Sequence, residues 1–421
     1  MTAERVLSRK QQREATAPVS ALERTSLAAV VLAIVCVWLL GWVPNLLTLL
    51  TAGRGQISGL SATVEVTELA VRASNLLSYG AFGLLLIAIL FSLPRVAAAR
   101  PGPYVLLLVA WGVINLLSGA DVSLTSVTLP VFVFAWMLVR PPARYIYRLL
   151  AWVGVATAAI SVGFALVSPL AFMSSDWAAN ADKALFGNDI LAGPYSHSNA
   201  LGLSLALTLP FVALNFKRTF RLAAVVLVSG ALLWSASRLS TAAAVFALCA
   251  SIIAIRASEP VARRLLSVAI MGLASVIVVL PLLTTNPTFF TNRGLIWMTS
   301  LRQTVDGAWL IGGGGSSYRE VNELTTAIGF VSTTGHNLFV TFFTTGGIVT
   351  VLLILMVLVT AYMNARRVFN VDRLQLLFLS ILLVLCVAED PLRALALGPQ
   401  SFVIYPMLLA MIDTSVRGAS E

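Results

Sequence analysis

The chain has 421 residues, of which 58% are hydrophobic and only 11% are charged, and its net charge is +10. A soluble domain would carry about 25% charged residues, so the composition excludes an ordinary soluble protein and indicates an integral membrane protein. The apolar residues also lack the period-two alternation of barrel strands, which leaves an all-α fold.

A helix needs roughly 20 apolar residues to cross a bilayer, and the sequence contains about twelve apolar blocks that could serve. They cover residues 26–50, 75–94, 103–118, 122–139, 149–170, 199–216, 219–236, 238–256, 264–284, 337–362, 374–389 and 397–413. We therefore predict a polytopic transmembrane domain over 26–421, behind a polar cytoplasmic tail over 1–25. This tail has no cleavage signature, so the first block is expected to be a retained helix.

The basic residues are distributed unevenly between the two sides of the predicted bundle. With a cytoplasmic N-terminus, 20 of the 28 basic residues fall on the cytoplasmic side, which is the bias that orients helices during insertion. The others are Arg54, Arg72, Lys183, Arg238, Arg293, Arg302, Arg319 and Arg393. Both termini are therefore expected in the cytoplasm, and the positive charge implies no nucleic-acid partner.

Two predicted external segments, 171–198 and 285–336, are too long to be simple turns, and long ordered loops are more often functional than idle. In the second, Asn292 is expected to cap a helix that runs through Thr304 and stops at Gly307. We expect the segment 285–336 to form a structured cap over a site.

A glycine run, Gly312–Gly315, follows this helix. Such a turn exposes backbone N–H groups that can bind an anion, so Gly313 and Gly315 are candidate binding residues, although the run would also suit a flexible hinge. A second cap helix is expected to open at residue 316 or 317 and to end near 329.

Four external arginines are not explained by the charge bias. Arg238 lies in a tight junction between two apolar spans, where an arginine usually faces a cavity or a ligand, unless it extends to the lipid headgroups. Arg293 and Trp297 are spaced i, i+4 and share a helix face. Arg302 falls on the opposite face and is expected to be solvated, as is Arg319.

The chain has two histidines, and both directly precede a predicted span on the external side. His197 lies in Gly-Pro-Tyr-Ser-His-Ser-Asn, and His336 lies in Thr-Thr-Gly-His-Asn. Histidine is the usual acid or base near neutral pH, although an interfacial histidine can also serve only as a structural hydrogen-bonding residue. Arginine holds phosphate oxygens in bidentate fashion. Together these residues suggest a site for a phosphorylated or diphosphorylated lipid-linked substrate, in which histidine activates a hydroxyl nucleophile.

A metal site is not expected, because two histidines and no Asp-x-Asp pair leave little to hold a divalent ion. The three cysteines all fall inside apolar blocks, where a thiol is a small hydrophobic group. We therefore expect neither a metal nor any other cofactor.

Four short stretches carry a family resemblance. They are Gly193-Pro-Tyr-Ser-His-Ser-Asn-Ala-Leu-Gly202, then Ser237-Arg238, then Arg293-x-x-x-Trp297 with Trp309-Leu-Ile-Gly-Gly-Gly-Gly315, and finally Gly335-His336-Asn337-Leu338. In this order, over about 193–350, the chain resembles the O-antigen ligase and O-antigen polymerase family of bacterial envelope enzymes. It departs from the family in having Trp309-Leu-Ile where a proline often precedes the glycines.

The resemblance implies a metal-independent, inverting glycosyltransferase with a multi-helix, glycosyltransferase-C-like fold in the bacterial cytoplasmic membrane. Its donor would be an undecaprenyl-diphosphate-linked glycan, and its acceptor a hydroxyl of a glycan, a lipid or a protein at the external face. The resemblance makes His336 the base, makes Arg238 and Arg293 the diphosphate ligands, and gives supporting roles to His197, Asn199, Asn337, Trp297, Gly313 and Gly315.

Two other classes of protein fit parts of the sequence. A transporter or flippase for a lipid or a polar solute would place polar groups at mid-membrane on broken helices, and few charges lie there. A glycosyltransferase of another kind would use an acidic base in the first external loop, where Glu65 and Glu68 lie. A solvated acidic loop face explains these two glutamates equally simply.

Overall fold

The computed structural model describes residues 21–54, 66–99, 101–117, 124–173, 189–318, 323–328, 334–395 and 397–413, and their regular structure is mostly helical. The helices are α2 (Ala21–Leu40), α3 (Val43–Ala52), α4 (Glu68–Ser92), η2 (Leu93–Ala98), α5 (Gly102–Leu117), α6 (Leu124–Val139), α7 (Ala143–Val167), η3 (Pro169–Ala171), α9 (Ser198–Asn215), α10 (Arg218–Trp234), α11 (Arg238–Arg256), α12 (Glu259–Leu283), α13 (Phe289–Gly307), α14 (Glu323–Ile328), α15 (Leu338–Arg367), α16 (Arg373–Cys386), η4 (Arg393–Leu395) and α17 (Ser401–Asp413). Two short strands, β1 (Phe172–Met173) and β2 (Ile190–Leu191), pair antiparallel with Phe172 opposite Leu191.

Seven helical segments of the described chain are long and apolar enough to cross a membrane. They are Ala21–Ala52, Glu68–Ala97, Ala143–Val167, Ser198–Asn215, Arg238–Arg256, Glu259–Leu283 and Leu338–Arg367. The other five predicted blocks coincide with α5, α6, α10, α16 and α17, which have between 13 and 17 residues. The all-α membrane class is confirmed, whereas the count of twelve spans stays a prediction.

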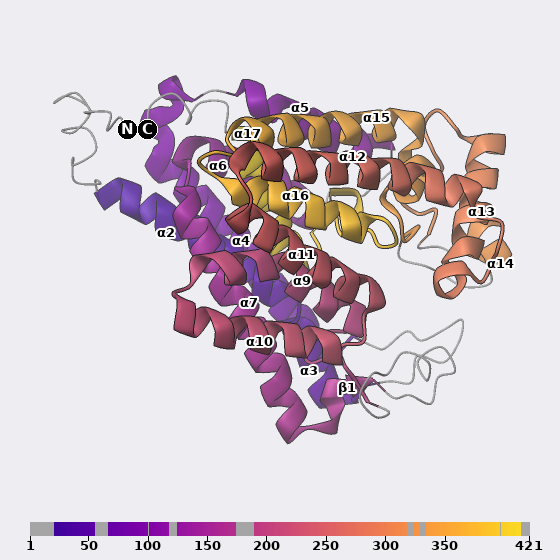
Figure 1. Cartoon of the computed structure of the whole chain (residues 1–421), viewed down its shortest axis with the longest axis horizontal. Coiled ribbons are helices and arrows are strands. Elements are labelled where there is room, and N and C mark those ends of the chain that lie inside the picture. The colour runs from indigo at the N-terminus through magenta and orange to yellow at the C-terminus, as the bar shows by residue number, and fades with distance from the viewer. Residues whose placement is uncertain are drawn as a thin grey trace.

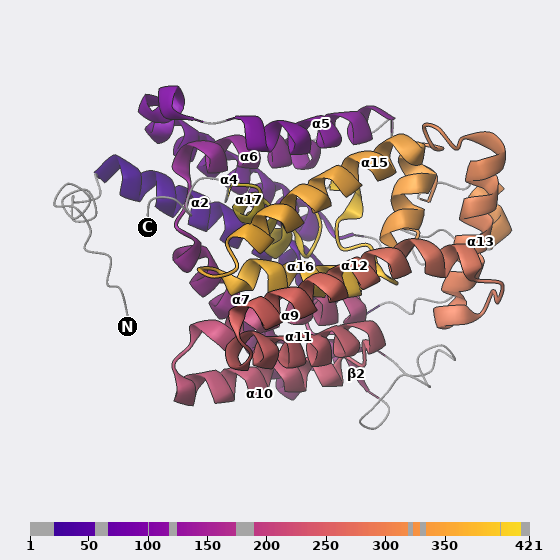
Figure 2. The same ribbon diagram turned by 45° about the horizontal axis from the view of Figure 1, so that its top comes forward.

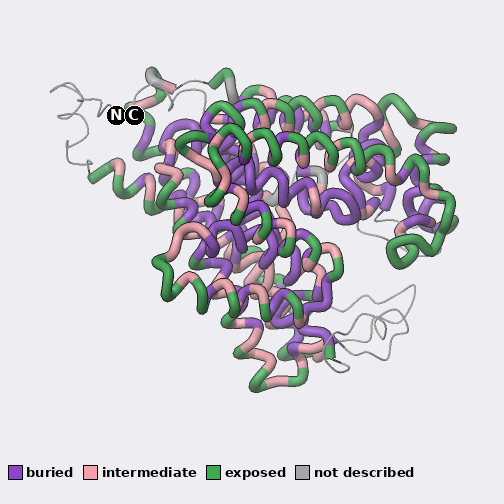
Figure 3. Tube along the Cα trace, in the orientation of Figure 1, coloured by how far each residue is buried: buried purple, intermediate pink, exposed green. Residues whose placement is uncertain are grey.

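The short helices α16 and α17 lie in the middle of the bundle together with α9 (Figures 1 and 2). Residues 374–383, 401–412 and 201–212 of these three helices are buried without interruption. A helix that is apolar and buried on every side packs against protein rather than lipid. Figure 3 shows such buried stretches inside the bundle, while its outer helices have exposed faces.

Between α12 and α15 the chain forms a small unit at one end of the bundle, opposite the start of α2 (Figure 1). We call its described residues, 285–318 and 323–328, the cap. The cap has its own buried apolar cluster, which also includes side chains of α15 and Ala388. The cluster comprises Ile296, Trp297, Leu301, Tyr318, Leu324, Ile328, Val340, Phe343 and Ala388.

The cap helices differ from the prediction at two points. Residues 290–292 have positive φ values, so the regular part of α13 begins at Arg293. The expectation that Asn292 caps this helix is wrong, because an N-cap residue is extended whereas Asn292 has a φ of 67°. The helix does end at Gly307, as predicted. Residues 316–318 form a turn, so the second cap helix, α14, starts later than expected.

The glycine run pairs through its backbone with a break in α15, where Gly346 and Gly347 leave helical geometry. Four hydrogen bonds join the two segments: Gly313 N to Thr344 O (2.8 Å), Gly314 N to Thr345 O (3.0 Å), Ile348 N to Trp309 O (2.9 Å) and Val349 N to Leu310 O (3.4 Å). The N–H groups of Gly313 and Gly314 therefore serve carbonyls of the protein. Of the two glycines predicted to bind an anion, Gly313 thus donates its N–H group within the protein, and Gly315 lies in the turn that follows.

Gly312 approaches α15 too closely for any side chain. A Cβ atom at this position would lie 2.4 Å from the backbone nitrogen of Gly346, and the φ of Gly312 is +69°. We expect Gly312→Ala to destabilise the protein by about 2 kcal/mol or more, since the clash is with backbone and the conformation strains alanine. Thermal unfolding in detergent should show a lower melting temperature.

Gly307→Ala is the matched control, because a Cβ atom at Gly307 would meet no atom within 4 Å. Its melting temperature should stay at the wild-type value. Equal melting temperatures for the Gly307 and Gly312 variants would contradict the close packing of the glycine run on α15.

Candidate functional site

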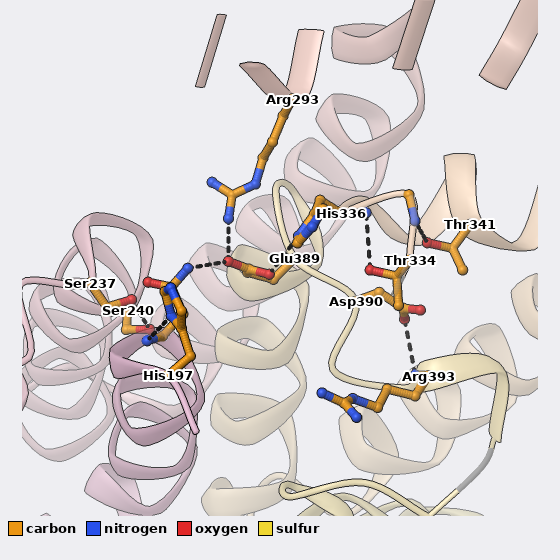
Figure 4. Close-up of polar contacts among 12 residues, drawn as sticks. His197, Ser237, Ser240, Arg293, Thr334, His336, Thr341, Glu389, Asp390 and Arg393 are labelled. Carbon is orange, nitrogen blue, oxygen red and sulfur yellow. Dashed lines mark hydrogen bonds and ion pairs between the residues drawn. The ribbon is translucent and has the colours of Figure 1, made fainter. Parts of the chain in front are cut away.

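The candidate site converges on Glu389, which follows the end of α16 and whose side chain is 11% exposed. Its Oε1 forms an ion pair with Arg293 and accepts a hydrogen bond from Nδ2 of Asn199 (3.1 Å). Its Oε2 lies 3.1 Å from Nδ1 of His336. Figure 4 shows Arg293 and His336 reaching the carboxylate from different directions. Segments separated by about two hundred residues in sequence therefore meet at one carboxylate.

Arg293 reaches Glu389 from the first regular turn of α13, and its side chain is 16% exposed. Trp297, one turn later, is fully buried, and its Nε1 donates a hydrogen bond to the carbonyl of Gly335 (3.0 Å). One face of α13 thus holds both the carboxylate and the loop that carries His336. Arg302 is 85% exposed and lies 3.9 Å from Asp306, so it is solvated as predicted.

His336 is held in a left-handed conformation, with a φ of 50°, just before α15. Its backbone N–H donates to Oγ1 of Thr334, and its ring lies against Glu389. An ionised carboxylate only accepts hydrogen bonds, so in the neutral ring the proton is on Nδ1 and the lone pair is on Nε2. The side chain is 28% exposed. This arrangement gives a base that can accept a proton at Nε2.

Asn337 fixes the start of α15 and is completely buried. Its Oδ1 accepts a hydrogen bond from the N–H of Val340, which caps the helix. Its Nδ2 donates to the carbonyls of Ile277 in α12 and Val387 after α16, at 3.0 and 2.8 Å. Asn337 therefore joins three helical segments and positions its neighbour His336.

His197 and Asn199 open α9 beside the same carboxylate. His197 is the N-cap residue, and its Nδ1 accepts a hydrogen bond from the N–H of Asn199 (3.0 Å). The amide group of Asn199 then donates to Glu389. His197 acts on the carboxylate through its charge, so both residues predicted to support the site lie next to its centre.

Arg54 organises the loop that leads to His197. Its guanidinium donates hydrogen bonds to the carbonyls of Leu170, Gly193, Tyr195 and Ser196, at 2.9 to 3.3 Å. Asn45 adds a bond from its Nδ2 to the carbonyl of Pro194 (2.7 Å). Burial lowers the pKa of Arg54 to about 10. Arg54, expected only as an external charge, thus holds four backbone carbonyls of two segments together.

Arg238 begins α11, and its side chain is exposed. The preceding Ser237 packs against α9, since a Cβ atom at Gly202 of α9 would lie 2.7 Å from the Cβ of Ser237. Arg238 is therefore at the same end of the bundle as the site. The charges of Arg293, His336 and His197 lower the pKa of Glu389. Arg293 thus meets His336 at Glu389, whereas the expected convergence of Arg238 with these two residues stays a prediction.

Two adjacent carboxyl groups have opposite electrostatic environments. Burial alone would raise the pKa of Glu389. The charge of Arg293, the hydrogen bond with His336 and the charges of both histidines outweigh burial, so the pKa falls to about 2. Burial raises the pKa of Asp390 to about 7. The Oδ1 of Asp390 accepts a hydrogen bond from the N–H of Arg393 (3.1 Å), and its Oδ2 is buried without a hydrogen-bond partner in the described structure. Glu389 is thus ionised at neutral pH, whereas Asp390 gains or loses its proton near neutral pH.

Sequence reasoning missed Glu389, although a signal was present. Glu389 lies at the end of the apolar block 374–389, and ionisable residues in such blocks are usually functional. Of the alternative acidic residues, Glu68 is 79% exposed and forms an i, i+4 ion pair with Arg72, which is the solvated arrangement. Glu65 and Arg319 lie outside the described residues.

No protein-family model matches the sequence, and no curated protein matches it significantly.

The pKa of Glu389 predicts how the stability of the protein depends on pH. A carboxyl group whose pKa falls from 4.5 to about 2 on folding stabilises the folded state above pH 4.5. This contribution is lost as the pH falls from 4.5 towards 2. The difference in melting temperature between the wild type and Glu389→Gln should therefore shrink over this interval when thermal unfolding is measured in detergent.

Glu68→Gln serves as the control for this titration, because the Glu68 carboxylate is exposed. It should change the melting temperature little at any pH, since surface ion pairs contribute about 0–1 kcal/mol. The opposite result would be a difference in melting temperature between wild type and Glu389→Gln that stays constant from pH 6 down to pH 2. That result would show that the neighbours of Glu389 do not keep its carboxylate ionised.

Proposed function

We propose that this protein transfers a glycan from a polyprenyl-diphosphate donor to an acceptor hydroxyl, as a metal-independent, inverting glycosyltransferase of the O-antigen ligase and polymerase type. The observation that carries the proposal is the contact of Arg293 and His336 with one buried carboxylate at the cap end of an all-α membrane protein. The proposed base and the proposed phosphate-binding cation, both predicted from sequence, thereby contact the same carboxylate.

In the proposed reaction, Nε2 of His336 removes the proton from the acceptor hydroxyl, whose oxygen forms a bond to the anomeric carbon of the donor. The bond between that carbon and the diphosphate oxygen breaks, and its electron pair leaves with the diphosphate. The Glu389 carboxylate stabilises the imidazolium that results, and it holds the ring through Nδ1. Protonated His336 can then release its proton to water.

The leaving diphosphate needs positive charge placed where its own charge develops. Arg293 has five N–H donors, and its ion pair with Glu389 is made through one nitrogen, which leaves donors for phosphate oxygens. Arg238, exposed at the start of α11, would bind the diphosphate from the periphery of the site. His197 and Asn199 position the carboxylate between them, and Trp297 and Asn337 position His336.

The wider assignment follows the family resemblance. We propose the bacterial cytoplasmic membrane as the location, with both termini in the cytoplasm, about twelve spans and a glycosyltransferase-C-like fold. The donor would carry its glycan on undecaprenyl diphosphate, and the acceptor would be a glycan, a lipid or a protein. The basic ends of α12 and α15 lie opposite the cap, which agrees with a site on the external face.

Two substitutions test the proposed chemistry. His336→Ala and Arg293→Ala should each lower the rate of glycan transfer by a factor of about 10² to 10⁴, because the first removes the base and the second removes charge stabilisation. Transfer is measured with purified protein in vesicles, a polyprenyl-diphosphate-linked glycan and candidate acceptors. Arg302→Ala, on the exposed face of the same helix, is the matched control and should keep wild-type activity.

Retained transfer after loss of His336 would overturn the proposed roles. Loss of transfer in the Glu65→Gln/Glu68→Gln variant, with His336→Ala active, would instead indicate a glycosyltransferase with an acidic base. Movement of the lipid-linked donor across the vesicle membrane without formation of a glycosidic bond would indicate a transporter or flippase.

The donor also needs a place for its isoprenoid chain. A groove of about 540 Å³ lies between α7 and α10, and its lining is apolar except for Asp189: Val162, Asp189, Val226, Leu227, Gly230, Ala231 and Trp234. Trp234 is the last residue of α10, four positions before Arg238. The groove thus reaches the junction between α10 and α11 that carries Arg238, so we assign it to the isoprenoid chain of a lipid with an anionic head.

Gly230 gives a direct test of this assignment, because a Cβ atom there would meet no atom within 4 Å. Gly230→Leu should fill the groove without disturbing the fold and should raise the KM for a long-chain donor about tenfold, through the loss of one or two buried methylene contacts. A donor with a short, soluble isoprenoid should show no change.

Gly272→Leu is the matched control, since Gly272 is also exposed and without neighbours, on α12. It should leave both KM values unchanged. An equal rise in KM for long-chain and short-chain donors in the Gly230 variant would show that the groove does not hold the chain.

A further inference from the structure

A second groove, of about 370 Å³, lies between the start of α12 and the end of α15. It is at the end of α12 opposite the cap, because α12 runs from Glu259 in the groove region to Leu283 beside the cap. Its lining combines three arginines, two hydroxyl groups and apolar side chains: Pro260, Arg263, Arg264, Ser267, Val268, Met271, Tyr362 and Arg366. None of these residues contributes to the candidate site around Glu389.

The groove carries uncompensated positive charge. Arg263 forms an i, i+4 ion pair with Glu259 at 3.2 Å. Arg264 and Arg366 have no carboxylate within ion-pair distance among the residues that the structure describes. Two guanidinium groups from different helices therefore face one groove. Planar guanidinium groups in such an arrangement bind phosphate oxygens in bidentate fashion.

The rest of the lining is arranged along the helices from polar to apolar. Val268 and Met271 follow Arg264 by one and two turns of α12 and are 56% and 55% exposed. Tyr362 precedes Arg366 by one turn of α15, and residues four apart share a helix face. A ligand in this groove would contact cations at one end and hydrocarbon at the other, which is the pattern of a phospholipid.

Ser267 adds an independent observation. It lines the groove, is 5% exposed, and its Oγ has no hydrogen-bond partner in the described structure. A buried hydroxyl group without a partner destabilises the protein, because it has lost its hydrogen bonds to water. A phosphate or ester oxygen in the groove would accept a hydrogen bond from this hydroxyl group.

We infer that the groove between α12 and α15 binds the phosphate headgroup of an anionic glycerophospholipid, with an acyl chain along Val268 and Met271. Basic pockets between helices on the cytoplasmic side of membrane proteins recognise such headgroups. The apolar continuation of the groove favours a bilayer lipid over a free phosphate compound. The bound lipid would hold α12 and α15 together at the end remote from the cap.

The test uses the purified full-length protein in detergent. Increasing amounts of phosphatidylglycerol, phosphatidylcholine or inorganic phosphate are added, and melting temperature and lipid retention in native mass spectrometry are recorded. Phosphatidylglycerol should raise the melting temperature and stay bound, whereas phosphatidylcholine and inorganic phosphate should do neither. The Arg264→Gln/Arg366→Gln variant should bind phosphatidylglycerol at least tenfold more weakly.

The matched control is Arg144→Gln/Arg148→Gln, which removes the same charge from two exposed arginines at the start of α7. This variant should retain wild-type binding of phosphatidylglycerol. Equal stabilisation by phosphatidylcholine, or by inorganic phosphate, would overturn the inference in favour of a nonspecific apolar groove or a free-phosphate site. Unchanged binding in the Arg264→Gln/Arg366→Gln variant, with its unliganded melting temperature preserved, would overturn it as well.

Discussion

The candidate site depends on the burial of one ionised carboxylate. A charge away from water is costly unless cations and hydrogen-bond donors surround it. Glu389 obtains these partners from three distant parts of the chain, through Arg293, His336 and Asn199. The contacts that stabilise the carboxylate therefore also hold the cap helix, the turn before α15 and the start of α9 in place relative to one another.

The surrounding helices make this geometry possible. The helices α9, α16 and α17 are buried on all sides and form the centre of the bundle. Asn199 lies at the start of α9, and Glu389 follows the end of α16. Asn337 ties the start of α15 to α12 and to the end of α16. Trp297 connects the cap to Gly335. Each of the polar groups around Glu389 is thus positioned by a helix end rather than by a free loop.

The coarse fold was predictable because apolar blocks of membrane length leave few alternatives. The described residues of each of the twelve blocks are mostly helical, and the shared face of Arg293 and Trp297 follows from their i, i+4 spacing. The place of Glu389 in an apolar block marked it as a candidate, but its partners could not be anticipated, because they lie 53 to 190 positions away in sequence. Such contacts are set by helix packing, which hydrophobicity and spacing do not encode. For the same reason, the sequence did not reveal the packing of the glycine run, in which the N–H groups of Gly313 and Gly314 donate to carbonyls of α15.

The attachment of residues 309–314 to α15 is made by main-chain atoms. Backbone hydrogen bonds are indifferent to the side chains that flank them, except where a glycine must be kept for close approach. The neighbouring Trp309, Leu310 and Ile311 side chains, exposed by 57%, 50% and 52%, can therefore be exchanged over evolution without detaching the loop. The attachment of this rim to the bundle thus makes no demand on the size, charge or polarity of its three exposed side chains.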